Sequence, residues 1–586
     1  MVPPKLTIQG GINTQIKTVT AFNHWQPWQT GQHGNDEIWV QSRTLQNRYG
    51  MAMHGALLCS GRHQPRFTGD AGHPEVEYTL NLAERRPVTI TKLVAVHTTR
   101  DTDQPLITAQ HTLAAARQKG YDRLYKEHCR AWEKVWELSD VEIEGDEFSQ
   151  QAIRFSIYHV LIAAPQHDEQ ANIGAKTLSG PGYRGHAFWD TELFMVPLLT
   201  ATQPKLSHNL MMYRYHRLAG ARAKAVAEGY QGAMFPWESD DTGEEVTPKW
   251  TPPDSKGKRI RIWTGDLEQH VTSDIAYAMM QYWRWTRDDE FMRQHGAEVI
   301  LDGASFWASR AEWKPEQARY EIHHVIGPDE YHEDVNNSVF TNRMARWHLE
   351  SALEVWDWLA SAHPDDARRL VEQLELSEAS RQRWQEVIQR LYIPFDTERQ
   401  IHIQYDGFFD LKPVDVLAFE PRVHSLQSVF SYETTRGLRI IKQADVVMLI
   451  ALLGEELAPR EVLLNNWNTY YPLCDHGSSL SPAVHAWVAA RLGFDQLAWE
   501  LFRHAAGIDL EDNKGNSRDG IHGAACGGLW QAIVFGFAGL RLSENGPILD
   551  PRLPAHWQQL RFCVSFHGKT YQITLLQGGG INISKR

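Results

Sequence analysis

The chain has 586 residues, a net charge of -13 at pH 7 and 22 tryptophans. Its acidic balance argues against nucleic-acid or anionic-membrane partners, and no apolar run approaches the roughly 20 residues that a membrane helix needs. A chain of this length exceeds one ordinary hydrophobic core, so we expect roughly two to four domains.

The five cysteines are scattered and form no CxxC pair, a pattern typical of a reducing compartment. The opening stretch MVPPKLTIQGGINTQ has no basic segment followed by an apolar one, so we expect no signal peptide. These features predict a cytoplasmic protein. Most of the tryptophans are expected in the core, but flat aromatic rings also suit the C–H faces of sugars, which favours a carbohydrate site.

Residues 1–104 alternate apolar and polar positions in short segments such as DEIWVQSRT and EVEYTLNLA. This period of two, with Gly, Pro and Asn between the segments, predicts antiparallel strands. Residues 105–146 are instead rich in Ala, Leu, Lys, Arg and Glu at helical spacing. They predict a helical linker between two domains.

Almost every periodic segment of residues 147–540 predicts a helix. VTSDIAYAMMQYWRWT covers 271–286, and SPAVHAWVAARLG (481–493) is followed after a short break by LAWELFRHAAG (497–507). Roughly ten or more helices without βαβ alternation predict an all-α barrel. Residues 541–586 return to a strand pattern, and LRFCVSFHGKTYQITLLQ predicts a hairpin with HGK as its turn.

The polar, glycine-rich segments of the helical region all fall between predicted helices. Because loops at one end of a helical barrel converge in space, we expect these segments to form one site. They are GYRGHAFWDTELF, GAMFPWESDDTGEE, TGDLEQHVTSD, VIGPDEYHEDVNNSVFTN, IKQADVV, CDHGSSLSPAVH and DGIHGAACGGLWQ.

Several familiar chemistries do not fit these loops. His323, His324 and His332 fall on different faces of their segment, so we expect no metal site there. No GxGxxG follows a strand, and neither a phosphate-binding GxxxxGK[ST] nor a GxSxG elbow occurs. What remains is carboxylate chemistry on a sugar, in which an acid protonates the leaving oxygen and a nucleophile attacks the anomeric carbon.

The nucleophile is left open by the residues alone. It can be a carboxylate, a water activated by one, or an anion such as phosphate. Phosphate would need hydroxyls, a histidine and backbone N–H groups at a helix start, and HGSSLSP offers these just before a predicted helix. Ser481 followed by Pro482 is also simply a good helix start, and both interpretations can hold together.

Five ordered motifs, GYRGHAFWDTE, GPDEYHEDVNN, KQADVV, HGSSLS and GIHGAACGGLWQ, resemble glycoside hydrolase family 65 over about residues 30–575. That family contains inverting phosphorylases of kojibiose, maltose, trehalose and nigerose and a few hydrolases. The resemblance implies a mainly α protein with an N-terminal β-sandwich, a helical linker, an (α/α)6 barrel, a small C-terminal β domain and a homodimer. Family members usually have more chain before RPVTITKLVAVHTTRD, so we expect a shortened or truncated sandwich here.

The resemblance also implies roles for individual residues. Glu330 in GPDEYH corresponds to the general acid. Residues that would hold the transferred glucosyl unit are Trp189, Asp190, Lys442 and Gln443, and those near the phosphate are His476, Ser478, Ser479, His522 and Gly523. Trp237, Glu268 and His270 are expected to contact the sugar and determine linkage specificity. Sugar and inorganic phosphate are the implied ligands, with no cofactor and no metal.

Phosphorolysis and hydrolysis are separated by His476 and its neighbour. The family's hydrolases carry a carboxylate general base where its phosphorylases carry this histidine, so His476 favours phosphate. Asp475 precedes it, and this carboxylate would repel a dianion or could activate water instead. We therefore expect inverting phosphorolysis of an α-glucosyl disaccharide, with hydrolysis and a catalytically incomplete sugar-binding protein as the alternatives.

Overall fold

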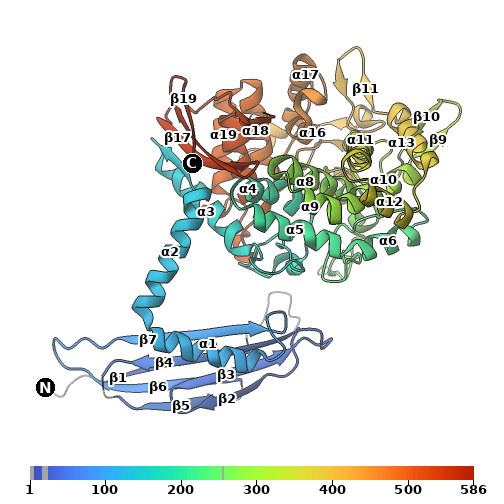
Figure 1. Ribbon diagram of the computed structural model, residues 1–586. Helices are drawn as coiled ribbons and strands as arrows, with labels where there is room; N and C mark the ends of the chain where they lie inside the picture. Colours follow the sequence, from blue (N-terminus) through green and yellow to red (C-terminus); the bar gives the residue numbers. More distant parts are fainter. Residues whose placement is uncertain (1–4, 16–23, 62, 71, 254–255, 545) are drawn as a thin grey trace. The chain divides into compact units, whose positions relative to one another are not determined.

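The computed structural model describes residues 5–15, 24–61, 63–70, 72–253, 256–544 and 546–586 (Figure 1). The chain divides into two compact units, which meet in sequence between Trp136 and Glu137. Among the described residues, no helix combines the length and the apolar composition that crossing a bilayer requires.

The first unit is built on two antiparallel sheets. One has the order β2-β3-β4-β7, formed by Gln29–His33, Glu37–Arg43, Gly50–Cys59 and Ile90–Thr98; the other has the order β1-β6-β5, formed by Lys5–Gly11, His73–Asn81 and Pro65–Asp70. Alternating residues such as Ile38 and Val40 of β3 and Val76 and Leu80 of β6 form a shared core. The N-terminal β-sandwich is therefore confirmed.

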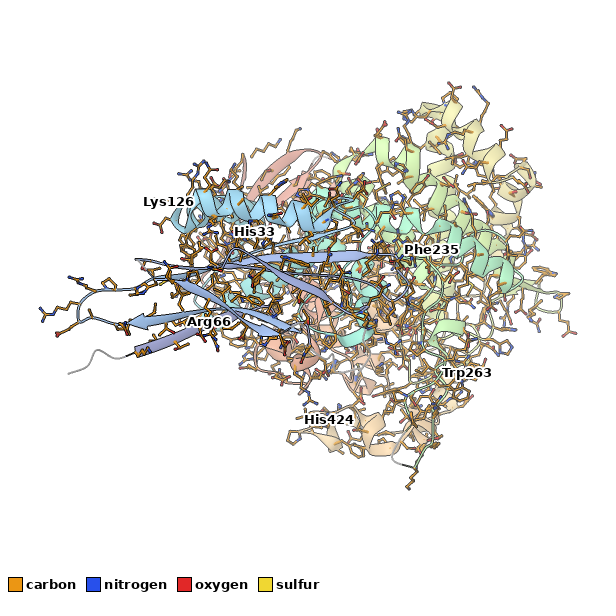
Figure 2. The ribbon with its side chains drawn as sticks, turned by 90° about the horizontal axis from the view of Figure 1, so that it is seen from below. His33, Arg66, Lys126, Phe235, Trp263 and His424 are labelled. Atoms are coloured by element: carbon orange, nitrogen blue, oxygen red, sulfur yellow. The ribbon has the colours of Figure 1, made fainter. Side chains whose placement is uncertain are left out.

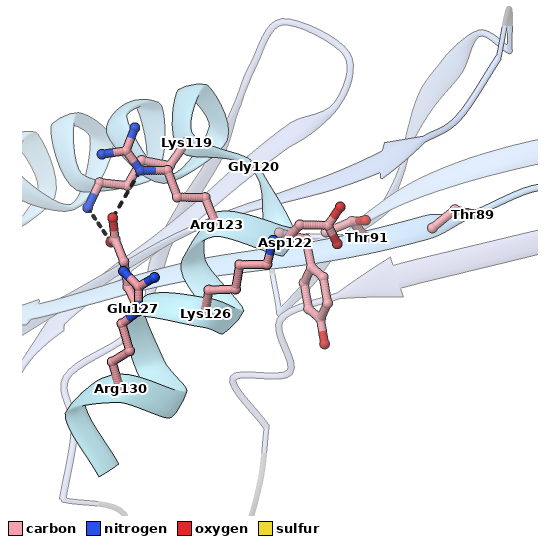
Figure 3. Close-up of a pocket in the computed structure, with 10 residues that line it drawn as sticks. Thr89, Thr91, Lys119, Gly120, Asp122, Arg123, Lys126, Glu127 and Arg130 are labelled. Carbon is pink, nitrogen blue, oxygen red and sulfur yellow. Dashed lines mark hydrogen bonds and ion pairs between the residues drawn. The ribbon is translucent and has the colours of Figure 1, made fainter. Parts of the chain in front are cut away.

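Two helices follow the sandwich where the composition predicts helix. They are α1 (Pro105–Lys119) and α2 (Tyr121–Ser139), separated by Gly120 with a φ of 75°. Lys119 donates to the Glu127 carboxylate across this break at 2.8 Å, and Arg123 donates to it at 3.0 Å within α2 (Figure 3). The hollow in Figure 3 is lined by such charged side chains and by none of the predicted site residues.

The second unit contains the predicted (α/α)6 barrel, which is confirmed. Within the described chain, six mostly buried inner helices follow one another, and each packs on the next, with the last returning to the first. They are η2–α4 (Thr191–Met195 and Val196–Thr202), α8 (Val271–Thr286), α11 (Val339–Ala362), α16 (Val446–Leu453), α18 (Ser481–Leu492) and α20–η9 (Gly523–Gln531 and Ala532–Phe537).

Outer helices alternate with the inner ones along the chain, which is how a single chain builds a double ring (Figure 1). They are α3 (Glu147–Ala163), α5 (Pro204–His216), α10 (Ala297–Arg310), α12 and α13 (Pro364–Gln373 and Glu378–Arg390), α17 (Arg460–Tyr470) and α19 (Asp495–Leu510). Shorter helices lie in the connections: α6 (Leu218–Ala227), α7 (Thr264–Leu267), α9 (Asp289–Phe291), α14 (Leu426–Phe430) and α15 (Tyr432–Thr435).

The connections also hold single helical turns and short strands. The turns are η1 (Gly182–Gly185), η3 (Met292–Gly296), η4 (Phe408–Asp410), η5 (Val416–Phe419), η6 (Gly454–Glu456), η7 (Tyr471–Leu473) and η8 (Ser517–Asp519). The strand pairs are β9–β10 (Glu312–Lys314, Arg319–Glu321), β11–β12 (Phe395–Asp396, Ile401–His402), β13–β14 (Lys412–Pro413, Leu438–Arg439) and β15–β16 (Arg541–Ser543, Gly546–Ile548).

The C-terminal sheet has the order β19-β18-β17-β8, from Gly580–Lys585, Lys569–Leu576, Gln559–Phe566 and Val141–Glu144. The predicted hairpin is present, and its turn residues are His567 and Gly568, both with positive φ. The sequence prediction placed β8 in the helical linker. A four-residue strand that pairs with residues about 400 positions away leaves no local pattern, so this pairing could not be read from the sequence.

Candidate active site

Apart from the loop of Trp237, which lies between α6 and α7, the predicted site loops lead into the inner helices. Trp189 and Asp190 precede η2, Glu268 and His270 precede α8, and Lys442 and Gln443 precede α16. Glu330 lies in the loop before α11, while the segments from His476 to Ser479 and at His522 precede α18 and α20. Since a helix N-terminus carries partial positive charge, this placement favours bound anions and carboxylates at the site.

The loop that carries Glu330 is closed by backbone pairing and by two asparagines. Val325 pairs with Val335 through two backbone hydrogen bonds of 3.0 and 2.9 Å. Asn336 accepts a hydrogen bond from the backbone N–H of His324, and Asn337 accepts one from Ile322. The two adjacent asparagines therefore fix the turn.

Asp329 orients the same loop from within the protein. Its buried carboxylate accepts hydrogen bonds from the backbone N–H of Lys442 at 2.8 Å, from Gln404 at 2.8 Å and from His332 Nδ1 at 2.7 Å. The other nitrogen of His332 lies 2.9 Å from the carbonyl of Leu438. Burial acts to lower the pKa of His332, but the Asp329 charge outweighs it and raises the pKa.

Glu330 is partly exposed, unlike the other acidic residues of this loop that lie close to it. Its side chain is 26% exposed, compared with 1% for Asp329 and 6% for Glu333. Lys442 Nζ lies 2.9 Å from Glu330 Oε1, and Gln443 Nε2 lies 3.4 Å from the same oxygen. Burial acts to lower the pKa of Lys442, but the Glu330 charge outweighs it and the pKa ends above its usual value.

Two of the other predicted sugar-binding residues form a buried aromatic wall with His270. The ring centre of Trp189 lies 5.0 Å from that of His270 and 6.4 Å from that of Trp237. Asp190 follows Trp189 and is buried, and burial raises its pKa from 3.8 to about 7. The carboxyl group of Asp190 is therefore partly protonated at neutral pH.

His270 lies between two buried carboxylates. Its Nδ1 is 2.6 Å from Asp274 Oδ2, and its Nε2 is 3.3 Å from Glu268 Oε1. Burial acts to lower the pKa of His270, but these carboxylates raise it to about 10. The second oxygen of Glu268 is buried without a hydrogen-bond partner within the described chain, and burial raises the Glu268 pKa well above its usual value.

Asp475 is committed to holding three segments together. Its carboxylate accepts hydrogen bonds from the Tyr331 hydroxyl at 2.7 Å, from the backbone N–H of Leu426 at 2.7 Å and from that of Gly477 at 2.7 Å. Arg422 also donates to its backbone carbonyl. Both carboxylate oxygens are buried and occupied, so Asp475 is poorly placed to activate a water molecule.

His476, Ser478 and Ser479 follow Asp475 and lead into α18. His476 Nδ1 lies 2.9 Å from the Ser481 hydroxyl, which is also 3.3 Å from Cys474 Sγ and 3.3 Å from His485 Nδ1. Cys474, His476 and His485 have the spacing of a metal-binding group. Because the Ser481 hydroxyl lies among these three ligand atoms, hydrogen bonds already account for the cluster.

His522 is fixed at the start of α20 by partners on both ring nitrogens. Nδ1 lies 2.7 Å from Asp509 Oδ1, and Nε2 lies 2.6 Å from Lys176 Nζ. Since the carboxylate takes the proton of Nδ1, Nε2 accepts from the lysine. Burial lowers the pKa of Lys176. Lys176 therefore brings an amino group to the loop where the sequence predicted His522 and Gly523 alone.

Sequence reasoning missed four residues of this region: Lys176, Tyr183, Asp274 and Asp445. Asp274 could have been predicted from the sequence, because it lies four positions after His270 and therefore on the same helix face. Tyr183 has a φ of 54° and its ring contacts Phe188, which in turn contacts Trp237. Burial raises the pKa of the Tyr183 hydroxyl, and the charges of Lys442 and Glu330 act on the same hydroxyl.

Comparison with known proteins gives the family. The model of the glycosyl hydrolase family 65 central catalytic domain matches residues 154–531, more than half of the chain. The chain belongs to glycosyl hydrolase family 65. The N-terminal and C-terminal domain models of family 65 match residues 4–135 and 540–585.

Three family 65 relatives illustrate the similarity. A kojibiose phosphorylase of Halothermothrix orenii is 41% identical over 504 residues, covering 84% of this chain and 64% of that protein. A nigerose phosphorylase of Lachnoclostridium phytofermentans is 36% identical over 506 residues, covering 83% and 66%. The solved structure named "Putative kojibiose phosphorylase from human microbiome" has a TM-score of 0.88 at 25% identity, covering 100% of this chain and 75% of that one. The chain spans about two thirds of the length of these two curated relatives.

Proposed function

We propose that the protein phosphorolyses an α-glucosyl disaccharide with inversion, giving β-glucose 1-phosphate and a released sugar. Membership of family 65 and relatives named as kojibiose and nigerose phosphorylases support this reaction type. Inorganic phosphate is the co-substrate, and no cofactor or metal takes part. We also carry over a homodimer from the family resemblance, which sedimentation analysis would test.

The proposed reaction begins with glucose bound against Trp189 and Asp190, with Lys442 and Gln443 beside Glu330. The proton of Glu330 passes to the glycosidic oxygen as the bond from that oxygen to C1 breaks. A phosphate oxygen forms the new bond to C1 from the opposite face. The Glu330 carboxylate is left ionised next to Lys442, whose ammonium group lies 2.9 Å away and stabilises the charge that develops there.

The observation that carries the proposal is that both carboxylate oxygens of Asp475 already accept hydrogen bonds from the protein. An inverting hydrolase needs a carboxylate free to take a proton from water. Asp475 is the acidic residue next to His476, and its oxygens already accept from Tyr331, Leu426 and Gly477. With that carboxylate engaged, the neighbouring hydroxyls and histidine are better suited to binding an anion than to activating water.

Phosphate would bind where α18 and α20 begin. Among the described residues, the Ser479 hydroxyl has no hydrogen-bond partner. The Ser478 hydroxyl accepts one hydrogen bond there, from the backbone N–H of Leu480. Burial lowers the pKa of His476 well below its usual value, so the ring is neutral before phosphate arrives. A bound dianion would favour the protonated ring, and phosphate binding would then take up a proton.

Linkage specificity would come from the side of the site formed by Trp237, Glu268 and His270. The Glu268 oxygen without a partner is a candidate acceptor for a hydroxyl of the released sugar. A buried polar atom of this kind discriminates strongly between sugars that can and cannot donate to it.

One assay tests the reaction. Purified protein is incubated with kojibiose, nigerose, maltose or trehalose, with and without inorganic phosphate, and β-glucose 1-phosphate and glucose are measured. We expect phosphate-dependent glucose 1-phosphate from one of the four and, for Glu330→Gln, a loss of at least about 100-fold. Glucose release that does not need phosphate would make the protein a hydrolase, and sugar binding without turnover would make it a binding protein.

A further inference from the structure

A small two-stranded ladder beside the proposed site carries two exposed tryptophans. Residues 249–251 pair with residues 260–262 through Thr251 N–H to the Ile260 carbonyl at 2.9 Å and Ile262 N–H to the Lys249 carbonyl at 3.1 Å. We call residues 249–251 and 260–263 the rim ladder. Trp250 lies opposite Arg261 in an isolated β-bridge, and Trp263 follows Arg261 by two residues. The Arg261 guanidinium group lies close to both tryptophan rings, so the three side chains share one face of the rim ladder.

Arg261 holds this face rigid. Its guanidinium group lies 4.5 Å from the ring centre of Trp263 and 5.8 Å from that of Trp250. It donates to the Lys249 carbonyl at 2.9 Å and forms an ion pair with Asp266. The charge of Arg261 is thus balanced locally, and the face offers flat aromatic surface more than free positive charge.

Trp250 and Trp263 are far more exposed than the two tryptophans of the buried aromatic wall. Trp250 is 51% exposed and Trp263 is 38% exposed, compared with 3% for Trp189 and 5% for Trp237. Figure 2 shows Trp263 near the outline of the larger unit in that view. A single exposed ring is common on protein surfaces, but two exposed rings that share one arginine form a contiguous aromatic patch of the kind that binds a ligand.

Hydrogen bonds connect the rim ladder to the loop that carries Glu330. The carbonyl of Arg261 lies 3.5 Å from the Tyr432 hydroxyl, and that hydroxyl also donates to Glu333, three residues after Glu330. The strand that ends at Trp263 runs into α7, where the carbonyl of Leu267 accepts a hydrogen bond from Ile326 at 3.0 Å. The rim ladder and the loop of Glu330 therefore belong to one wall.

We propose that Trp250 and Trp263 form an additional sugar subsite, which binds a third pyranose ring when the substrate is longer than a disaccharide. The inference rests on the proposed function. With the non-reducing glucose at the buried tryptophans, a longer substrate extends from the deep end of the site toward its rim. A neutral pyranose fits better than an anion, because Asp266 balances Arg261 and the exposed groups are aromatic.

The test measures binding without turnover. The Glu330→Gln chain is titrated calorimetrically with kojibiose, kojitriose, maltose and maltotriose. We expect one trisaccharide to bind about tenfold more tightly than its own disaccharide. Adding Trp250→Ala and Trp263→Ala should remove that gain and leave disaccharide affinity within about twofold. Trp313→Ala is the matched control, since Trp313 is 37% exposed on β9 and outside the rim ladder.

Three results would each overturn the subsite. They are equal affinity for disaccharide and trisaccharide in Glu330→Gln, a gain that survives the double tryptophan variant, and binding of none of the four sugars. Trp263→Phe, which keeps an aromatic ring, should retain most of the gain and so exclude a merely structural loss. The proposed phosphorolysis is tested separately by glucose 1-phosphate formation in the unsubstituted chain, so a failure of that reaction is distinguished from a failure of the subsite.

Discussion

Glu330 and Asp475 are both acidic residues of the proposed site, but their neighbours give them different properties. Glu330 is partly exposed and meets the side chains of Lys442 and Gln443. Asp475 is buried and accepts from three separate segments of the chain. An exposed carboxylate can exchange a proton with a substrate, whereas a saturated one stabilises loops. Two carboxylates of one site therefore need not have the same chemical role.

Asp190 provides a test of function against stability at the residue scale. Burial raises its pKa from 3.8 to about 7, so the folded protein holds this proton more tightly than the unfolded chain does. Stability therefore falls as pH rises between these two values, by on the order of 4 kcal/mol in total. We expect Asp190→Asn to raise the melting temperature more at pH 8 than at pH 5, while phosphorolysis is lost.

The measurement is a pair of thermal melts at each pH, with Asp334→Asn as the control. Asp334 is an exposed acid whose side chain is 53% accessible. Its replacement should change the melting temperature little at either pH. An Asp190→Asn shift of equal size at pH 5 and pH 8 would contradict the assignment of a buried, pH-sensitive charge.

At the scale of elements, the site depends on six inner helices that begin at one mouth. Close packing of these helices fixes where each preceding loop stands. Gly527 in α20 shows how close this packing is, because a Cβ at that position would lie 2.2 Å from the backbone carbonyl oxygen of Phe194 in η2. Backbone cannot rotate away as a side chain can, so η2 and the preceding Asp190 would have to move.

Gly527→Ala should therefore destabilise the protein by ~1–3 kcal/mol and lower activity through η2. Gly528→Ala is a matched control on the same helix, since its Cβ would meet two side chains, Ala483 at 3.0 Å and Phe194 at 3.5 Å, and not the backbone of η2. Melting temperature and specific activity of the two variants are compared. Equal losses would show that helix propensity, not the approach of α20 to η2, sets the effect.

The sequence predicted the elements well where a pattern is local. The helix expected over 271–286 is α8 with the same ends, and that expected over 481–493 is α18, which is followed by Gly493 in a left-handed conformation. Periodicity and a chain-breaking residue are both local signals. The strand β8 was missed because its partner β17 is distant in sequence.

The site was predictable as a set of loops but not as a set of contacts. Motifs in the sequence placed Glu330, Lys442 and Gln443 in one site, and the structure brings them within hydrogen-bond distance. No sequence pattern connects Lys176 with His522, which lie 346 positions apart and meet at 2.6 Å. Packing of two loops against each other creates that contact, so it needs the fold.

At the scale of the whole molecule, the chain has two units with separate cores. The sandwich core of the first unit contains residues such as Ile38 and Val76, while the predicted catalytic residues all lie after Glu137. A ligand that binds only the second unit should stabilise only that unit. Substrate binding can therefore report whether the two units unfold as one.

We expect two calorimetric transitions, the larger with about three times the enthalpy of the smaller, since enthalpy scales with residue number. Saturating inorganic phosphate should raise the temperature of the larger transition and leave the smaller one in place. Asp475→Asn should lower the larger transition alone, because its hydrogen bonds to Tyr331, Leu426 and Gly477 all lie within the second unit. A single transition, or two that shift together with phosphate, would show that the units unfold cooperatively and that the first unit shares the stability of the site.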